Sequence, residues 1–241
     1  MKTNEIVILS SDYQYPTKDE RHLASLVYPK IENFGFGYKN EFQLFFEDKK
    51  KNIEVKREVD LYHWDTCLLN KLGKLRDTYT FLYTCYQREI TNGFTGKDII
   101  NKYLFDYYTE IFYYFYFSTR DLIAQIINVY CDLKLTESDV FIPKISSKIK
   151  NTVFGAILDT FLKATSDASK FRNNFTHTFP LNYPDYRGTI IKDNGKESYG
   201  FGGGKSTSHE TYMDNINYSY KVLDEFVSSL RIEFQIKKPC S

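Results

Sequence analysis

The chain has 241 residues, and with 42% of them hydrophobic it is long enough to bury the core of one large domain. Its 32 Lys and Arg residues nearly balance its 31 Asp and Glu residues, so the overall composition does not indicate a nucleic-acid or membrane partner. No apolar run approaches the roughly 18 residues of a spanning helix, and the start MKTNEIVILSSDYQYP lacks a signal-peptide core, so we expect a soluble cytoplasmic protein.

Residues 1–57 are expected to form an irregular N-terminal cap. Within it, the stretch EFQLFFEDKKKNIEVKRE has alternating apolar residues on both sides of a charged turn. That alternation is typical of a β-hairpin, which we place near residues 42–56. A short helix is compatible with residues 17–32, before Gly35 and Gly37 end it.

From about residue 58 the apolar residues recur at intervals of three and four, which predicts amphipathic helices. Asn92-Gly93 ends the first of these, Ser146 or Ser147 caps the third, and Pro180 stops the third. A capping box over Thr207–Glu210 opens the fourth. The four expected helices span about residues 58–91, 97–133, 146–179 and 208–236.

One long interruption separates the third expected helix from the fourth. It contains TIIKDNGKESYGF, in which Asn194-Gly195 is a strong signal for a two-residue turn, so a hairpin is expected near residues 188–201. Together these elements predict an all-α protein, an antiparallel up-and-down four-helix bundle with small β-hairpin elaborations. The bundle is expected to span residues 58–236, with the hairpin inserted at 186–201.

Metal and nucleotide sites have little support in the sequence. No two of the four histidines are three or four residues apart and no CxxC pair exists, so we expect no metal site and no cofactor. Gly204-Lys205-Ser206 copies the end of a phosphate-binding loop, but Tyr199 stands where that loop needs its first glycine. We interpret this stretch as a glycine-rich hinge whose backbone amides and Lys205 can still contact a phosphate.

The stretch FRNNFTHTFP, residues 171–180, gathers polar residues at the end of the third expected helix. At about 100° per residue, Arg172, Asn173 and His177 project into one arc that we expect to border the core. One interpretation is a solvated helix end, where cations suit the negative end of the helix dipole. The other is a partly buried network or a cleft in which the three side chains converge on one ligand.

A helical bundle with R-N-x-x-x-H late in its third long helix resembles the HEPN superfamily, whose ribonucleases carry an R-x(4-6)-H motif. Arg172, Asn173 and His177 match that motif position by position, and the resemblance covers about residues 58–236. It implies a metal-independent endoribonuclease in which a 2′-hydroxyl attacks the adjacent phosphate. His177 would then exchange protons, Arg172 would stabilise the charge on the phosphorane, and Asn173 would orient His177 or a phosphate oxygen.

Three further polar residues near the motif are candidates for supporting roles. Thr176 is a weaker candidate for the orienting task, and Lys170 and Lys205 could extend a phosphate track. For both lysines a solvated surface position is the stronger interpretation.

The resemblance also implies partners. HEPN proteins resemble one another in forming a composite cleft between two copies, so we expect RNA as the substrate and a symmetric homodimer with the site at its interface. A toxin or antiphage defence role, with an antitoxin or another regulator, is compatible with the family. Some HEPN toxins extend the motif to R-x4-H-x-Y, and Phe179 stands at that tyrosine position, which argues against control by tyrosine AMPylation. The alternative is a non-catalytic HEPN-like protein that binds RNA or a nucleotide, or acts as a scaffold.

Overall fold

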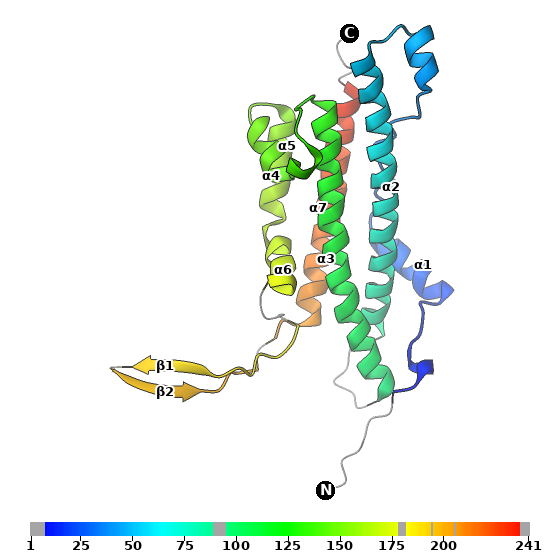
Figure 1. Cartoon of the computed structure of the whole chain (residues 1–241). Helices are drawn as coiled ribbons and strands as arrows, with labels where there is room; N and C mark the ends of the chain where they lie inside the picture. Colours follow the sequence, from blue (N-terminus) through cyan, green and yellow to red (C-terminus); the bar gives the residue numbers. More distant parts are fainter. Residues whose placement is uncertain (1–7, 89–94, 178–181, 194, 205, 237–241) are drawn as a thin grey trace.

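The computed structural model describes residues 8–88, 95–177, 182–193, 195–204 and 206–236, and in those residues helices predominate (Figure 1). In chain order the elements are α1 (Lys18–Val27), α2 (Asn52–Gln87), α3 (Gly96–Tyr130), α4 (Ile142–Lys148), α5 (Val153–Ala164), α6 (Ser166–His177), β1 (Thr189–Asp193), β2 (Lys196–Gly200) and α7 (His209–Ile236).

The long helices α2, α3 and α7 pack lengthwise, and the run α4–α6 forms the fourth column of the bundle (Figure 1). The expected all-α class with a small hairpin is confirmed. Aromatic residues make up much of the core, as expected for default burial of large apolar side chains. The largest fully buried side chains include Tyr79, Tyr113, Tyr116, Tyr212, Phe105 and Phe112. No helix in the described ranges is long and apolar enough to cross a membrane.

Local capping explains where two of the long helices begin. The Thr95 hydroxyl accepts a hydrogen bond from the Asp98 amide at 3.3 Å, and the Asp98 carboxylate accepts one from the Thr95 amide at 3.2 Å, a reciprocal cap that starts α3. At α7 the Ser208 hydroxyl accepts from the Thr211 amide at 3.2 Å. The start of α7 therefore differs from the expected Thr207–Glu210 box by one residue.

The single long third helix expected from residue 146 to 179 is wrong, because the chain breaks into α4, α5 and α6. Gly155 explains the first break: a Cβ at this position would lie 2.3 Å from the Ile149 carbonyl oxygen, so only glycine lets the start of α5 approach that turn. Thr152 caps α5 by accepting from the Gly155 amide at 3.1 Å. Ser146, one of the two expected caps, instead lies buried inside α4.

The hairpin expected near residues 42–56 is also wrong. Gln43–Glu47 forms one π-helical turn, and α2 already begins at Asn52, so Ile53 and Val55 are helical. The Lys51 amide donates to the Glu54 carboxylate at 3.1 Å, which fixes the helix start. An alternation of two or three apolar residues is too short to distinguish a strand from a helix end.

A buried carboxylate fastens the segment before α2 to the bundle. Asp65, on α2, is 1% exposed and accepts hydrogen bonds from the Asn33 side chain at 2.8 Å and from the amides of Phe34, Gly35 and Phe36 at 2.8 to 2.9 Å. A carboxylate that receives four donors holds its partners more strongly than neutral hydrogen bonds would. This interaction places the chain before α2 against the bundle.

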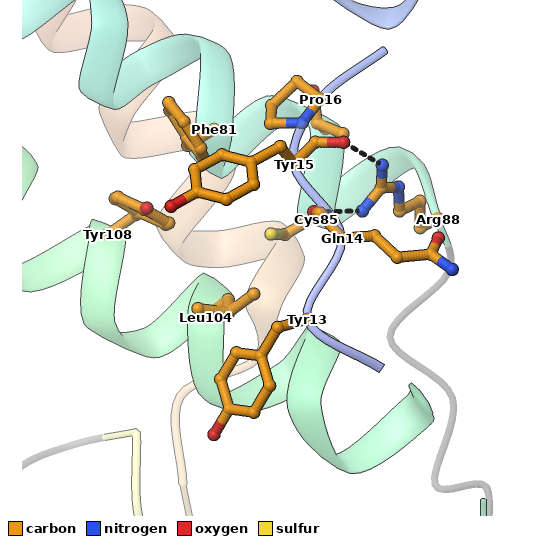
Figure 2. A pocket seen from close by; sticks show the side chains of 10 residues that line it. Tyr13, Gln14, Tyr15, Pro16, Phe81, Cys85, Arg88, Leu104 and Tyr108 are labelled. Atoms are coloured by element: carbon orange, nitrogen blue, oxygen red, sulfur yellow. Dashed lines mark hydrogen bonds between the residues drawn. The ribbon is translucent and has the colours of Figure 1, made fainter. Parts of the chain in front are cut away.

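A second polar clamp holds the strand-like stretch that precedes α1 (Figure 2). Arg88 donates to both carboxylate oxygens of Glu20, at 2.7 and 2.8 Å, and to the carbonyl oxygens of Gln14 and Tyr15 at 2.9 and 3.2 Å. The guanidinium lowers the pKa of Glu20 to about 2. Under the clamp lies a small apolar hollow of about 110 Å³, with a lining that includes Tyr13, Phe81, Cys85, Leu104 and Tyr108.

The hairpin predicted near residues 188–201 is confirmed. β1 and β2 pair antiparallel from Thr189 opposite Gly200 to Asp193 opposite Lys196. Gly195 has φ of 79°, the left-handed geometry that a two-residue hairpin turn needs, and Asn194 lies outside the described residues. The hairpin extends away from the helices (Figure 1).

Replacing Asp65 with alanine is expected to destabilise the fold by about 3 kcal/mol, since the amides of Phe34, Gly35 and Phe36 would lose a shared charged acceptor. Chemical denaturation followed by circular dichroism measures this loss. The matched control is Asp77→Ala on the exposed side of the same helix, where a change within about 0.5 kcal/mol is expected. Equal stability of the two variants would contradict the anchoring role.

Candidate functional site

Two phenylalanines fix the rotation of α6 against the bundle. Phe171 lies 5.0 Å from Tyr212 of α7 and 6.0 Å from Tyr113 of α3, measured between ring centroids. Phe175, one turn later, lies 5.7 Å from Tyr212 and 5.9 Å from Tyr113. Offset and tilted ring contacts at these distances are favourable beyond the area they bury. Because both rings point inward, the opposite side of α6 faces solvent.

Arg172 and Asn173 of the motif lie on that solvent-facing side. Both are exposed, as is Thr176, so the expectation that the arc of the motif borders the core is wrong for these two residues. The reason is geometric: Asn173 follows Phe171 by two residues, or about 200° around the helix, and Phe171 faces inward. The polar residues therefore form an open surface on the isolated chain.

Hydrogen bonds organise this surface locally. Arg172 Nη1 donates to the amide oxygen of Asn173 at 3.2 Å. The Thr176 hydroxyl donates toward the backbone carbonyls of Arg172, at 3.1 Å, and Asn173, at 3.4 Å. The Asn173 amide oxygen thus orients the guanidinium of Arg172, and the Thr176 proton is used within the helix.

The remaining expected site residues are placed less completely. His177 is the final residue of α6 and occupies the position one turn beyond Asn173, but its side chain lies outside the described residues. Lys170 is exposed and pairs with Asp167 at 2.7 Å, so part of its charge is neutralised. Lys205 lies outside the described residues. Over the described ranges no group of three or more His, Cys, Asp or Glu side chains could hold a metal ion.

The structure adds a titratable pair that the sequence did not reveal. Asp106 of α3 is 6% exposed, and its Oδ1 lies 3.8 Å from Nε2 of the half-buried His209, the first residue of α7. His209 also meets the ring of Phe105 edge-on at 5.0 Å. Asn182, which follows α6, is buried near the same carboxyl, and neither its side-chain amide atoms nor Asp106 Oδ1 has a hydrogen-bond partner among the described residues. Asp106 and His209 are far apart in sequence, and neither stands in a local motif.

Burial dominates the ionisation of both groups. Desolvation raises the pKa of Asp106 from its ordinary 3.8 to about 6; the nearby Asn182 amide and Lys102 oppose this rise, and Glu110 adds to it. Desolvation lowers the pKa of His209, Lys102 lowers it further, and Glu210 opposes. Perturbed carboxyl and imidazole groups side by side are typical of functional sites, although ion pairs that only stabilise a fold share this property.

A comparison with protein families gives one match to the chain. A family model described as HEPN_Cthe2314-like HEPN matches residues 64–237. That span contains α3 through α7 and most of α2, including the motif on α6. No curated protein and no solved structure matches the chain.

Replacing Asp106 with asparagine is expected to stabilise the protein at pH 8 by an amount on the order of 2 kcal/mol. The folded state holds the Asp106 proton more tightly than the unfolded state, so this carboxyl makes stability fall as pH rises from about 4 to about 6. The asparagine variant does not lose stability in this pH range, and the free energies of unfolding of the two proteins should converge below about pH 4.

Thermal unfolding from pH 4 to pH 8 checks this expectation. Asp121→Asn, at a half-exposed carboxylate on the same helix, is the control and should not show the same pH-dependent gain. A D106N variant that is equally or less stable than the parent at pH 8 would contradict the assignment of a destabilising buried charge.

Proposed function

Because the matched span covers well over half of the chain, the protein belongs to the HEPN_Cthe2314-like HEPN family, and we propose that it is a metal-independent endoribonuclease. HEPN domains are commonly ribonucleases. The observation that carries the proposal is the exposed Arg172–Asn173 pair on the last turns of α6, at the first two positions of the R-N-x3-H motif. The resemblance found in the sequence is thereby supported at the level of the family.

The proposed reaction is attack of a ribose 2′-hydroxyl oxygen on the adjacent phosphorus. The bond from phosphorus to the 5′-oxygen of the next nucleotide breaks, which leaves a 2′,3′-cyclic phosphate and a 5′-hydroxyl. One proton leaves the 2′-hydroxyl and one joins the departing oxygen, so no redox step and no net change of charge is needed. Groups that exchange these protons and stabilise the phosphorane accelerate the step.

Arg172 is suited to stabilise the phosphorane. Its planar guanidinium presents several N–H donors in fixed directions that match phosphate oxygens. The hydrogen bond from its Nη1 to Asn173 fixes one edge of the group and leaves the other donors for a ligand. Asn173 thus acts as a positioning residue for Arg172, while its amide nitrogen can still donate to a phosphate oxygen.

His177 is assigned the proton transfers. The unperturbed pKa of a histidine, about 6.5, lets it accept and donate a proton near neutral pH. In the proposal His177 acts together with Arg172 and Asn173, since position 177 follows Asn173 by one turn of α6. Lys170 would add only long-range attraction for the RNA phosphates, because its ammonium group pairs with Asp167.

A second copy of the chain completes this site in the proposal. Among the described residues, Arg172 and Asn173 are exposed to water, and one chain provides one motif histidine, whereas cleavage benefits from both a base and an acid. Two copies of α6 facing one another across a two-fold axis supply both groups and enclose the phosphate. We assign such an activity to a toxin or defence role, in which an antitoxin or another regulator holds it in check.

The alternative function is RNA or nucleotide binding without cleavage. The open, exposed position of Arg172 and Asn173 favours this alternative, since contact with a phosphate requires neither enclosure nor a titratable group. RNA cleavage in the proposed reaction needs His177, whereas RNA or nucleotide binding without cleavage does not.

Substituting His177 or Arg172 with alanine is expected to lower RNA cleavage by about 10² or more, because each change removes a proton-transferring or charge-stabilising group. Cleavage by the parent protein should persist in EDTA. The measurement is the initial rate on labelled RNA, with melting temperatures of all variants recorded.

The matched controls are His22→Ala, at an exposed histidine of α1, and Lys163→Ala, at an exposed cation of α5. Both should retain parental rates. Loss of activity in EDTA, or full activity in the H177A protein, would overturn the assignment, and RNA binding without any cleavage would establish the alternative function.

Specific activity is expected to rise with protein concentration and to level off as dimers form, because the proposed site needs two chains. Sedimentation velocity over the same range gives the dimer fraction for comparison. A monomer with full specific activity would rule out a composite site. It would still be consistent with an endoribonuclease whose site lies within one chain.

A further inference from the structure

The β1–β2 hairpin is an arm with apolar side chains exposed on both faces. Ile190 and Tyr199 pair across the strands on one face, and each is 64% exposed. Ile191 is 52% exposed on the other face, and Phe201, just after β2, is 85% exposed. All these side chains lie on a part of the chain that extends away from the bundle (Figure 1). A protein surface seldom gathers so many exposed large apolar side chains without a binding role.

The stability of such an arm is itself informative. A two-stranded hairpin on its own is marginally stable at best in water, and it gains stability by packing against a further strand or surface. In the part of the chain that the structure describes, the sheet has two strands, so the outer edge of each strand carries backbone groups that no third described strand pairs. Both the side chains and the backbone edges of the arm are therefore suited to docking.

The charges of the arm indicate what kind of partner docks there. Arg187 pairs with Asp185 at 2.7 Å, and Lys192 pairs with Glu197 at 2.8 Å. The two remaining charges, those of Asp193 and Lys196, also cancel, so the described residues of the arm from 185 to 201 carry no net charge. A surface that tracks nucleic acid carries excess positive charge. The arm thus suits a protein surface better than an RNA backbone.

We propose that the hairpin arm docks onto a second copy of this chain and holds the two α6 helices of the dimer together. The arm is self-complementary, since identical strand edges can pair antiparallel across a two-fold axis without any other partner. β1 begins twelve positions after His177, and that length of chain spans at most about 40 Å, so an interface at the arm keeps the motif end of each chain within that distance of it. This inference rests on the proposed function, for which it names the surface that assembles the composite site.

The test is sedimentation velocity without RNA on the full chain carrying Ile190→Asp and Tyr199→Asp. Both side chains are exposed, so the helical circular dichroism signal and the melting temperature should stay unchanged. The parent is expected to be a dimer at micromolar concentration and the double variant a monomer. The matched control is Leu26→Asp, at a 69% exposed leucine of α1 far from the arm in sequence, and it should remain dimeric.

A double variant that remains dimeric overturns the proposal, and so does a parent that stays monomeric at all concentrations. If the variant is dimeric but loses RNA binding, the arm is an RNA contact and the proposal is equally wrong. Binding to phospholipid vesicles by the parent alone, with no change in dimerisation, would assign the arm to a membrane and also overturn it. Because sedimentation needs no catalysis, these outcomes are independent of whether the protein cleaves RNA.

Discussion

The packing of Phe171 and Phe175 between Tyr113 and Tyr212 determines which side of α6 faces solvent. Four ring contacts with centroids 5.0 to 6.0 Å apart join α6 to α3 and α7 at once. A rotation of α6 by one residue, about 100°, would break all four contacts and bury a polar motif residue instead. The core thus exposes Arg172 and Asn173 without contacting them. For this exposed surface to carry out the proposed cleavage, something else must exclude water from it.

The long helices could be predicted because their apolar residues follow a regular period over many turns. α3 begins at Gly96 where 97 was expected, and α7 begins at His209 where 208 was expected, whereas α2 begins six residues before the expected 58. The break into α4, α5 and α6 could not be predicted, because it depends on the close approach of Gly155 to the Ile149 carbonyl. The hairpin wrongly expected before α2 came from an alternation too short to exclude a helix start.

The site was partly predictable, since the motif positions follow from local spacing alone. The expected orientation is wrong for Arg172 and Asn173 because Phe171 is a second inward residue beside Phe175. The pairing of Asp106 with His209 joins the third turn of α3 to the first residue of α7, and no local pattern announces such a contact. The anchoring of Asn33 to Phe36 by Asp65 is of the same kind, because it depends on tertiary packing.

The most direct test of the central claim uses an oligonucleotide that is 2′-O-methylated at every position except one. If cleavage proceeds through a 2′-hydroxyl on the exposed α6 surface, the parent protein will cut after the single free ribose, in EDTA, and leave a 2′,3′-cyclic phosphate. The Arg172→Ala protein will cut the same strand far more slowly. Cleavage of a fully 2′-O-methylated strand, or products with 3′-hydroxyl ends, would contradict the account.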